Sequence, residues 1–297
     1  MTACFFCSTV LIHSSARELI RMPELPEVQT LVNDLNAAGL VGKRIAGAAV
    51  YWPRSIAKLS PKVFCTRIRA KTIRHIWRRG KFIVFDLSAD HHLLIHLRMT
   101  GRLHLVAPDL KRSKHEHVIL TLGKRLHLRF HDTRKFGRMF LVNDLEPILN
   151  PLGPEPLAAA FTARMLTDRL QSRKRLMKPL LLDQAFIAGL GNIYVDEALW
   201  EARIHPCRIA TSLSKTETKA LHRAIPKVLN RGLKNLGTSL GTGKSNFYSV
   251  ARHRGRNQDQ LKVFRRAGLP CPRCKTRVER IIVGQRSTHI CSRCQKI

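Results

Sequence analysis

The first regular hydrophobic pattern along the chain is helical. Between residues 28 and 35, apolar side chains recur at intervals of three and four positions, which places them on one face of a helix. Pro26 fits the first turn of this helix, Glu27 complements its positive end, and Gly39 is a suitable stop. The predicted buried face consists of Val28, Leu31, Val32 and Leu35.

A different pattern, of short strands, runs from about residue 43 to about residue 145. Apolar or alternating runs follow one another here, with Gly80, Gly101 and Gly123 between them. Several short strands within about a hundred residues predict an antiparallel β-sandwich. The clearest runs are 82–87, 93–97, 117–122 and 125–130.

The remainder of the chain is helical and ends in a cysteine-rich segment. Proline is dense in 150–156, which indicates a domain boundary, and a helical pattern follows as far as about residue 237. Residues 237–259 then read as a long basic loop of the kind that is usually functional. We therefore predict an α+β multidomain chain: an N-terminal extension (1–21), a sandwich (22–149), a helical domain (150–262) and a ribbon (263–297).

The chain has eight cysteines, and the last four form two Cys-x-x-Cys pairs separated by sixteen residues. Two such pairs at the ends of a hairpin can place four thiolates around one zinc ion. A disulfide framework is the alternative, but these cysteines are confined to one end and no secretory signal is apparent. The predicted ligands are Cys271, Cys274, Cys291 and Cys294.

The other four cysteines receive no chemical role. Cys4 and Cys7 form a third Cys-x-x-Cys pair, but no second pair lies nearby to complete a metal site. Cys65 and Cys207 are interpreted as small packing residues.

The net charge of the chain indicates which class of molecule it binds. The 297 residues include 53 Lys and Arg against 20 Asp and Glu, which gives a formal net charge of +33. A surplus of this size favours a polyanion, most commonly nucleic acid. The hydrophobic fraction of 44% excludes a disordered basic tail, and no apolar run is long enough for a membrane-spanning helix. Aromatic residues make up 6%, which favours phosphate binding over base stacking.

Several motifs, taken in order, resemble formamidopyrimidine-DNA glycosylases, the bacterial enzymes that remove 8-oxoguanine and ring-opened purines. The resemblance spans 22–297 and ends in the four-cysteine ribbon. The motifs are Pro23-Glu-Leu-Pro-Glu-Val-Gln-Thr, Arg79-Gly-Lys-Phe, His96-Leu-Arg-Met-Thr-Gly, Lys114-His-Glu-His-Val, Asp132-Thr-Arg-Lys-Phe-Gly, Leu152-Gly-Pro-Glu-Pro-Leu and Gly189-Leu-Gly-Asn-Ile-Tyr.

The resemblance implies a fold and two activities. The expected architecture is an N-terminal β-sandwich, a helix–two-turn–helix DNA-binding domain and a C-terminal zinc ribbon with one structural Zn²⁺. The expected activities are N-glycosylase and abasic-site lyase, in a monomer that binds double-stranded DNA with oxidised bases or abasic sites. The expected location is the bacterial cytoplasm, in association with the nucleoid.

Pro23 matches the nucleophile of that family, an N-terminal proline that attacks C1′ of the sugar and forms an imine. An α-amino group has a pKa of about 7.7–8.0, against about 10.4 for lysine, so more of it is the free amine at neutral pH. With residues 1–21 attached, however, the Pro23 nitrogen is a tertiary amide and cannot attack. We therefore expect 1–21 to be a mis-assigned start, with Met22 removed from the mature chain.

The resemblance assigns roles to several other charged residues. Glu24 matches the general acid/base, and Glu27 matches a second carboxylate, although a dipole complement is an equally good interpretation of it. Lys81 matches a lysine that contacts phosphate and assists base removal. Arg286 matches the arginine that holds the phosphates beside the lesion and is linked to δ-elimination. Lys178 is expected to be structural.

Enzymes of this family insert side chains into the gap that an everted nucleotide leaves in the duplex. These side chains offset the cost of unstacking, which is a few kcal/mol. Met99, Arg134 and Phe136 match this intercalating set. Two departures occur nearby: Arg98 stands where glycine is frequent in the family, and Thr133 where proline is frequent. Residues that match DNA contacts of the family are His115, Arg134, Arg173, Lys174 and Asn192.

Alternative functions remain open at this point. An endonuclease VIII-like enzyme would act on oxidised pyrimidines, but Leu25 and the intercalating set favour the purine branch. A non-catalytic zinc DNA-binding protein would result if residues 1–21 were retained. An RNA-binding zinc-ribbon protein fits the charge and the cysteines but leaves Pro23 and Glu24 unexplained. Residues 237–259 match the lesion-recognition loop of the family poorly.

Overall fold

The computed structural model describes residues 22–240, 247–251 and 253–297. The expected extension at 1–21, with Cys4 and Cys7, and part of the expected basic loop lie outside these residues. The chain forms two compact units. One contains the described residues as far as Pro151 together with Gly232–Gln258, and the other contains Leu152–Arg231 and Asp259–Ile297.

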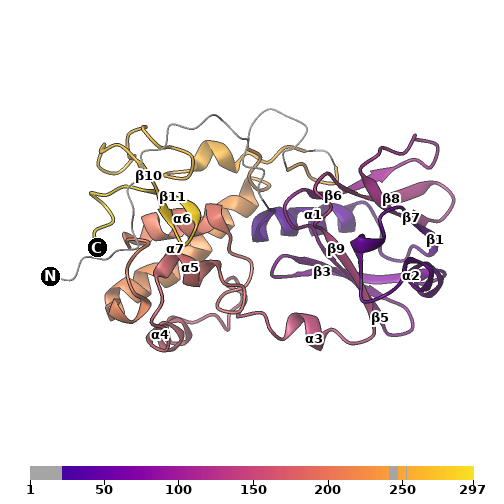
Figure 1. Cartoon of the computed structure of the whole chain (residues 1–297), viewed down its shortest axis with the longest axis horizontal. Coiled ribbons are helices and arrows are strands. Elements are labelled where there is room, and N and C mark those ends of the chain that lie inside the picture. The colour runs from indigo at the N-terminus through magenta and orange to yellow at the C-terminus, as the bar shows by residue number, and fades with distance from the viewer. Residues whose placement is uncertain (1–21, 241–246, 252) are drawn as a thin grey trace. The chain divides into compact units, whose positions relative to one another are not determined.

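The first unit begins with the predicted helix, α1 (Leu25–Ala37), drawn in indigo in Figure 1. Glu24 is its N-cap, Pro26 lies in its first turn, and Gly39 follows its end with a φ of 66°. Its apolar face is buried, so the helix, its start and its stop are confirmed. The buried apolar side chains include Val28, Leu31, Val32 and Leu35.

In the described part of this unit, nine strands form two sheets, ordered β1-β7-β8-β6 and β2-β9-β5-β4-β3. Every pairing is antiparallel except the short one between β2 and β9, which is parallel. The strands are β1 (Ile45–Val50), β2 (Ile56–Ala57), β3 (Ile73–Arg79), β4 (Phe82–Leu87), β5 (His91–His96), β6 (Gly101–Val106), β7 (Glu116–Leu122), β8 (Leu126–Asp132) and β9 (Arg138–Val142).

One hydrophobic core joins the two sheets, α1 and α2 (Pro61–Ile68). Side chains such as Phe85, Leu93 and Phe130 are almost fully buried in it. Burying one such side chain stabilises the fold by about 1.5–3 kcal/mol, so this core gives the unit its own stability. The predicted β-sandwich is therefore confirmed, with the parallel β2–β9 pair as its one departure from an antiparallel arrangement.

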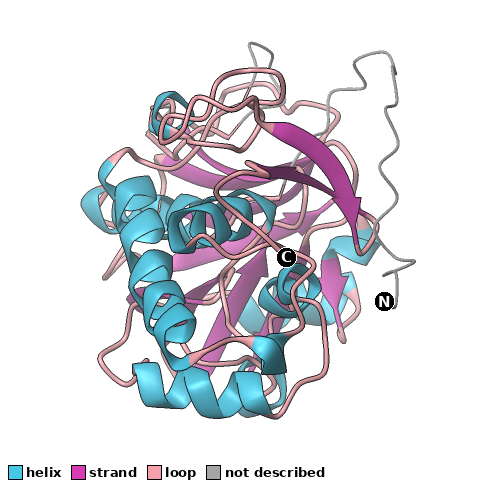
Figure 2. Cartoon of the chain, turned by 90° about the vertical axis from the view of Figure 1, so that its left-hand side faces the viewer, coloured by secondary structure: helices cyan, strands magenta, loops and turns pink. Residues whose placement is uncertain are grey.

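The second unit is mostly helical, as the sequence predicts. Figure 2 draws the helices of both units in cyan. Its helix α6 is apolar and buried along most of its length, which makes it the central helix. No helix in the described part of the chain is long and apolar enough to cross a membrane. The main helices are α4 (Ala163–Gln171), α5 (Met177–Leu182), α6 (Asn192–Ala202) and α7 (Lys215–Lys234). The last residues of α7 belong to the first unit, as does the short helix α3 (Glu146–Leu149).

The second unit ends in a hairpin of β10 (Glu279–Val283) and β11 (Arg286–Ile290). Its two-residue turn, Gly284 and Gln285, has positive φ at both positions, as the tight turns of hairpins require. The hairpin side chains Ile281, Val283 and Ile290 pack against Cys207, which confirms a packing role for that cysteine.

Candidate active site and DNA-binding residues

The start of α1 and the β3–β4 turn lie at the same end of the first unit. Gln29 Oε1 accepts a hydrogen bond of 3.0 Å from Arg78 Nε, and Asn36 Nδ2 donates one of 3.0 Å to the carbonyl oxygen of Ile76. The N-terminal end of α1 therefore lies beside the C-terminal end of β3, which leads into the β3–β4 turn. This arrangement brings Pro23 and Glu24, which precede α1, to the end that carries Lys81.

The two glutamates at the start of α1 are almost fully buried. Glu27 Oε2 accepts the backbone N–H of Glu24 at 2.9 Å, and its Oε1 accepts the N–H of Thr238 at 2.7 Å. A Cβ on Gly237 would lie only 2.9 Å from Glu27 Cγ, so only glycine fits there. Glu27 thus caps the helix and also fixes the start of the 237–259 segment.

Lys81 is buried at the start of β4, close to His96 at the end of β5. Phe82 pairs with His96 across the sheet, and their rings meet edge to face at 4.7 Å. Burial, with the positive charges of Arg98 and Lys81, lowers the pKa of His96 to about 3. The imidazole is therefore neutral at physiological pH, and its Nδ1 accepts the N–H of Arg98 at 3.1 Å.

The strand register also brings the predicted intercalating residues together. His96 of β5 pairs with Arg138 of β9, and Gly101 of β6 pairs with Asp132 of β8. The loop 97–100 and the loop 133–137 therefore lie side by side, at the same end as Lys81. Phe136 is 46% exposed, and the Arg134 guanidinium lies 4.9 Å from the centre of its ring.

Asp132, which the sequence analysis did not single out, joins these two loops. Its fully buried carboxylate accepts hydrogen bonds from Thr100 Oγ1, from the N–H of Gly137 at 2.7 Å and from the N–H of Arg134 at 3.2 Å. Lys135, between the two exposed residues, has a φ of 61° and places its ammonium 4.0 Å from the centre of the Trp52 ring. The loop conformation is therefore set from both sides.

His115 lies beside this end of the sandwich, since its carbonyl oxygen accepts the N–H of Asp132 at 2.9 Å. Its ring is 5.6 Å from that of His131, which in turn is 5.7 Å from His104. Burial, with the positive charges of His104, Arg102 and His115, lowers the pKa of His131 to about 4. Of these three histidines, only His115 lies at a position that the sequence resemblance assigns to DNA binding.

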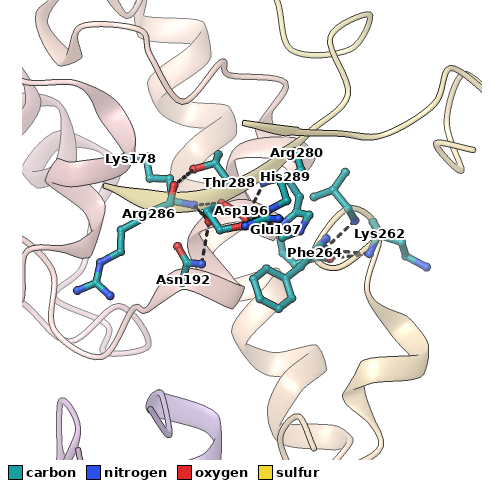
Figure 3. A network of polar contacts seen from close by, with 12 residues as sticks. Lys178, Asn192, Asp196, Glu197, Lys262, Phe264, Arg280, Arg286, Thr288 and His289 are labelled. Carbon is teal, nitrogen blue, oxygen red and sulfur yellow. Dashed lines mark hydrogen bonds and ion pairs between the residues drawn. The ribbon is translucent and has the colours of Figure 1, made fainter. Parts of the chain in front are cut away.

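In the second unit, Asn192 and Arg286 are brought together although they are far apart in sequence. Asn192, the first residue of α6, donates from Nδ2 to the carbonyl oxygen of Ser287 at 2.9 Å. Arg286 precedes Ser287 at the start of β11, is exposed, and extends away from the buried contacts (Figure 3). An amide nitrogen carries two hydrogens, so Asn192 Nδ2 can donate a second hydrogen bond.

Arg173 and Lys174 follow α4 and are exposed. The hydrogen bonds of the Arg173 guanidinium go to Ser172, its neighbour in sequence. No described contact joins this pair to Asn192 or Arg286. Their assignment to DNA therefore continues to rest on the sequence resemblance.

The four predicted zinc ligands converge at the end of the chain. Their sulfur atoms all lie within 4.8 Å of one another, as ligands of a single cation must. Burial raises the pKa of Cys291 to about 12, whereas a hydrogen bond involving Thr276 lowers that of Cys274 to about 6. Thiolate sulfur is the donor that Zn²⁺ prefers in structural sites. The predicted cluster is confirmed: Cys271, Cys274, Cys291 and Cys294 can hold one zinc ion.

Three family descriptions match the chain in order. The formamidopyrimidine-DNA glycosylase N-terminal domain matches residues 22–139, the H2TH domain of the same enzymes matches 152–243, and a zinc finger found in these glycosylases and in IleRS matches 268–297. A formamidopyrimidine-DNA glycosylase of Protochlamydia amoebophila is 47% identical over 275 residues, which are 93% of this chain and 100% of the relative. The chain belongs to the formamidopyrimidine-DNA glycosylase family.

Solved structures of this family agree with the fold. The Lactococcus lactis enzyme in complex with DNA that contains an abasic site is 34% identical, with a TM-score of 0.85, and the match covers 92% of this glycosylase and 100% of that chain. The same enzyme with DNA containing an N7-benzyl-Fapy-dG has a TM-score of 0.85, with 93% and 100% covered. A second relative, from Herpetosiphon aurantiacus, is 43% identical, with 92% of this chain and 100% of the relative covered. The glycosylase therefore has the predicted three-part architecture.

Proposed function

We propose that the glycosylase removes oxidised purines, namely 8-oxoguanine and formamidopyrimidines, from duplex DNA, and then cleaves the abasic site by β,δ-elimination. It would act as a monomer on bacterial chromosomal DNA, in association with the nucleoid. The observation that carries this proposal is the meeting, at one end of the sandwich, of the start of α1, Lys81 and the two loops of the intercalating residues. A base can be removed only where nucleophile and wedge act on the same nucleotide.

Each group at that end has a task that its chemistry fits. The Pro23 nitrogen attacks C1′ and the base leaves, which forms an iminium ion that later eliminations use as an electron sink. Glu24 moves protons to and from the sugar, and Lys81 binds phosphate and assists base removal. Glu27 holds the start of α1 and Thr238 in place. The intercalating groups are Met99, Arg134 and Phe136.

The phosphates beside the lesion need donors with positive charge. We assign this task to Asn192 and Arg286, which the structure places around Ser287, and to His115, Arg134, Arg173 and Lys174. Arg286 would also promote δ-elimination by fixing the phosphate that leaves. The ribbon that carries Arg286 would be held by one Zn²⁺ bound to the four cysteines, whose sulfur atoms lie within 4.8 Å of one another.

Borohydride trapping tests the chemistry. A duplex with 8-oxoguanine opposite cytosine is incubated with chain that begins at Pro23 and, separately, with the 297-residue chain. Reduction of the imine gives a covalent protein–DNA adduct, and we expect it only when the Pro23 nitrogen is free. The same chain with its Pro23 nitrogen acetylated is the matched control, because any adduct that it forms must come from another amine.

Three results would change the proposal. Adducts with the 297-residue chain would show that Pro23 is not the nucleophile. Adducts on a duplex with an oxidised pyrimidine, but none on 8-oxoguanine, would favour the endonuclease VIII-like alternative. Binding without any adduct would leave the non-catalytic DNA-binding function.

A further inference from the structure

Lys178, for which the resemblance gives no task in the proposed reaction, forms a fully buried ion pair with Asp196. Its Nζ lies 2.5 Å from Asp196 Oδ1, and both side chains are 0% exposed. Such a pair gains little stability over apolar side chains of similar size, because removing two charges from water is costly. Its contribution must therefore be sought in what it holds in place.

The pair holds β11 against α5 and α6 (Figure 3). Asp196 Oδ2 accepts the backbone N–H of His289 at 2.9 Å and lies 3.2 Å from His289 Nδ1. Lys178 Nζ donates to the carbonyl oxygen of Ser287 at 3.0 Å, the same oxygen that Asn192 Nδ2 contacts at 2.9 Å. The residue after Arg286 is thus fixed by one donor from α5 and one from α6.

A second contact fixes the residues before Arg286. A Cβ built on Gly284 would lie 2.7 Å from Pro179 Cγ, so the hairpin turn rests directly on the residue that follows Lys178. Gly284 also has a φ of 53°, which disfavours any other residue. Arg286 therefore stands between two anchor points, the Gly284 turn and the Ser287 carbonyl oxygen.

We propose that Lys178 and Asp196 are positioning residues that dock the β10–β11 hairpin on α5 and α6, so that Arg286 and Asn192 bind DNA phosphate as one preformed unit. The arrangement lowers the cost of binding, because neither backbone has to be ordered when DNA arrives. The proposal rests on the function proposed above only in that it assigns Arg286 and Asn192 to phosphate.

A double-mutant cycle tests the coupling. The variant Lys178→Met with Asp196→Leu removes both charges together, which avoids a lone buried charge. Affinity is measured for a duplex with an unreactive tetrahydrofuran abasic analogue. We expect about a tenfold weaker Kd and a salt slope reduced by about one, as for loss of one phosphate contact. In chain that already carries Arg286→Ala and Asn192→Ala, the same pair of changes should have no further effect.

A backbone variant provides an independent test. Gly284→Ala forces the turn away from Pro179, whereas Gly268→Ala introduces the same kind of strain at a φ of 82° in the same ribbon, with nothing within 4 Å. We expect Gly284→Ala to weaken DNA binding several-fold more than Gly268→Ala, with the zinc content of both unchanged.

Two outcomes would overturn the proposal: equal losses for the two glycine variants, or an effect of the charge pair that persists after Arg286 and Asn192 are removed. A wild-type chain that does not bind the duplex would instead refute the proposed function. Because the analogue cannot react, the result is independent of whether Pro23 is the nucleophile.

Discussion

Arg98, one residue before Met99, has a backbone conformation that favours glycine. Its φ is 53°, in the left-handed region, where a side chain costs roughly 1–2 kcal/mol. This conformation suits the glycine that the sequence resemblance leads us to expect at this position. Arg98→Gly removes this strain. The greater conformational freedom of glycine in the unfolded chain lowers the resulting gain in stability by about 0.5–1 kcal/mol. We therefore expect the free energy of unfolding in urea to rise by about 0.5–1 kcal/mol.

Arg203 offers a matched control for this prediction, since it has a φ of 60° at the C-cap of α6. Arg203→Gly should give a similar gain in stability. DNA affinity should change only with Arg98→Gly, because only that variant loosens the loop that carries Met99. A loss of stability in both variants would show that the left-handed conformation is not the source of strain.

His96 makes stability depend on pH. Its folded pKa of about 3 is below its usual value of 6.5, because burial favours the neutral imidazole. The unfolded chain therefore takes up a proton at higher pH than the folded chain. The stability from this group is complete above pH 6.5 and is lost as pH falls from 6.5 toward 3. Between pH 6.5 and 5 the loss should be about 2 kcal/mol.

The variant His96→Asn tests this assignment, because an amide oxygen can still accept the N–H of Arg98. Urea denaturation at pH 7.5 and at pH 5.0 should show a smaller difference for the variant than for the wild type. His253→Asn, at an exposed position, is the control and should keep the wild-type difference. An unchanged difference in His96→Asn would assign the pH dependence to other groups.

At the scale of elements, the sequence predicts what depends on local periodicity. The helical spacing of α1 and the apolar runs of β4, β5, β7 and β8 can be recognised because each pattern is complete within one segment. The meeting of the loops 97–100 and 133–137 cannot be recognised in this way, since it depends on the register of β5 with β9 and of β6 with β8. The motif resemblance places Met99 and Phe136 in one intercalating set. The sheet register gives the physical reason why the two loops that carry them lie side by side.

Buried polar residues limit sequence interpretation in the same manner. Asp196 lies in the apolar helix α6, eighteen residues after Lys178. In the sequence, neither residue can be told apart from a charged residue on the surface. Asp132 lies within a motif of the family, but its carboxylate accepts hydrogen bonds from backbone groups that come close to it only after folding. Such residues become visible as functional only through their contacts.

Asp132 permits a prediction about the two loops. Asp132→Asn keeps the size of the side chain but removes the charge that strengthens its hydrogen bonds, each worth about 1.5–3 kcal/mol. We expect stability to fall by about 2 kcal/mol and affinity for a tetrahydrofuran duplex to fall several-fold, measured by urea denaturation and fluorescence anisotropy. Thr100→Val removes one bond to Asp132 and the bond of 3.1 Å that Thr100 Oγ1 accepts from the N–H of Arg134. It leaves the carboxylate charge in place, so it should give a smaller change in both stability and affinity. Loss of stability without loss of affinity would separate Asp132 from the wedge.

At the scale of the whole molecule, the zinc ribbon and the sandwich have separate cores. The sandwich core contains no residue of the ribbon, whereas the ribbon core consists of Trp200, Val263, Val278 and two of the cysteines. Arg273 stacks on Trp200 at 4.1 Å and also donates to its carbonyl oxygen, which ties the ribbon to α6. A ribbon this small depends on the metal for its fold. The consequences of losing zinc should therefore be confined to one part of the chain.

We predict that a zinc chelator strongly weakens DNA binding while the sandwich stays folded. The hairpin that carries Arg286 loses its support, so affinity for a tetrahydrofuran duplex should fall by at least about tenfold, and added Zn²⁺ should restore it. Trp200 reports on the ribbon, because of the chain's three tryptophans only Trp200 packs in its core. Its fluorescence should change on chelation, whereas hydrogen exchange in β4 and β5 should not. Faster exchange in those strands would show that the two cores unfold together. DNA binding that survives chelation would show that Arg286 does not need the folded ribbon to reach the phosphates.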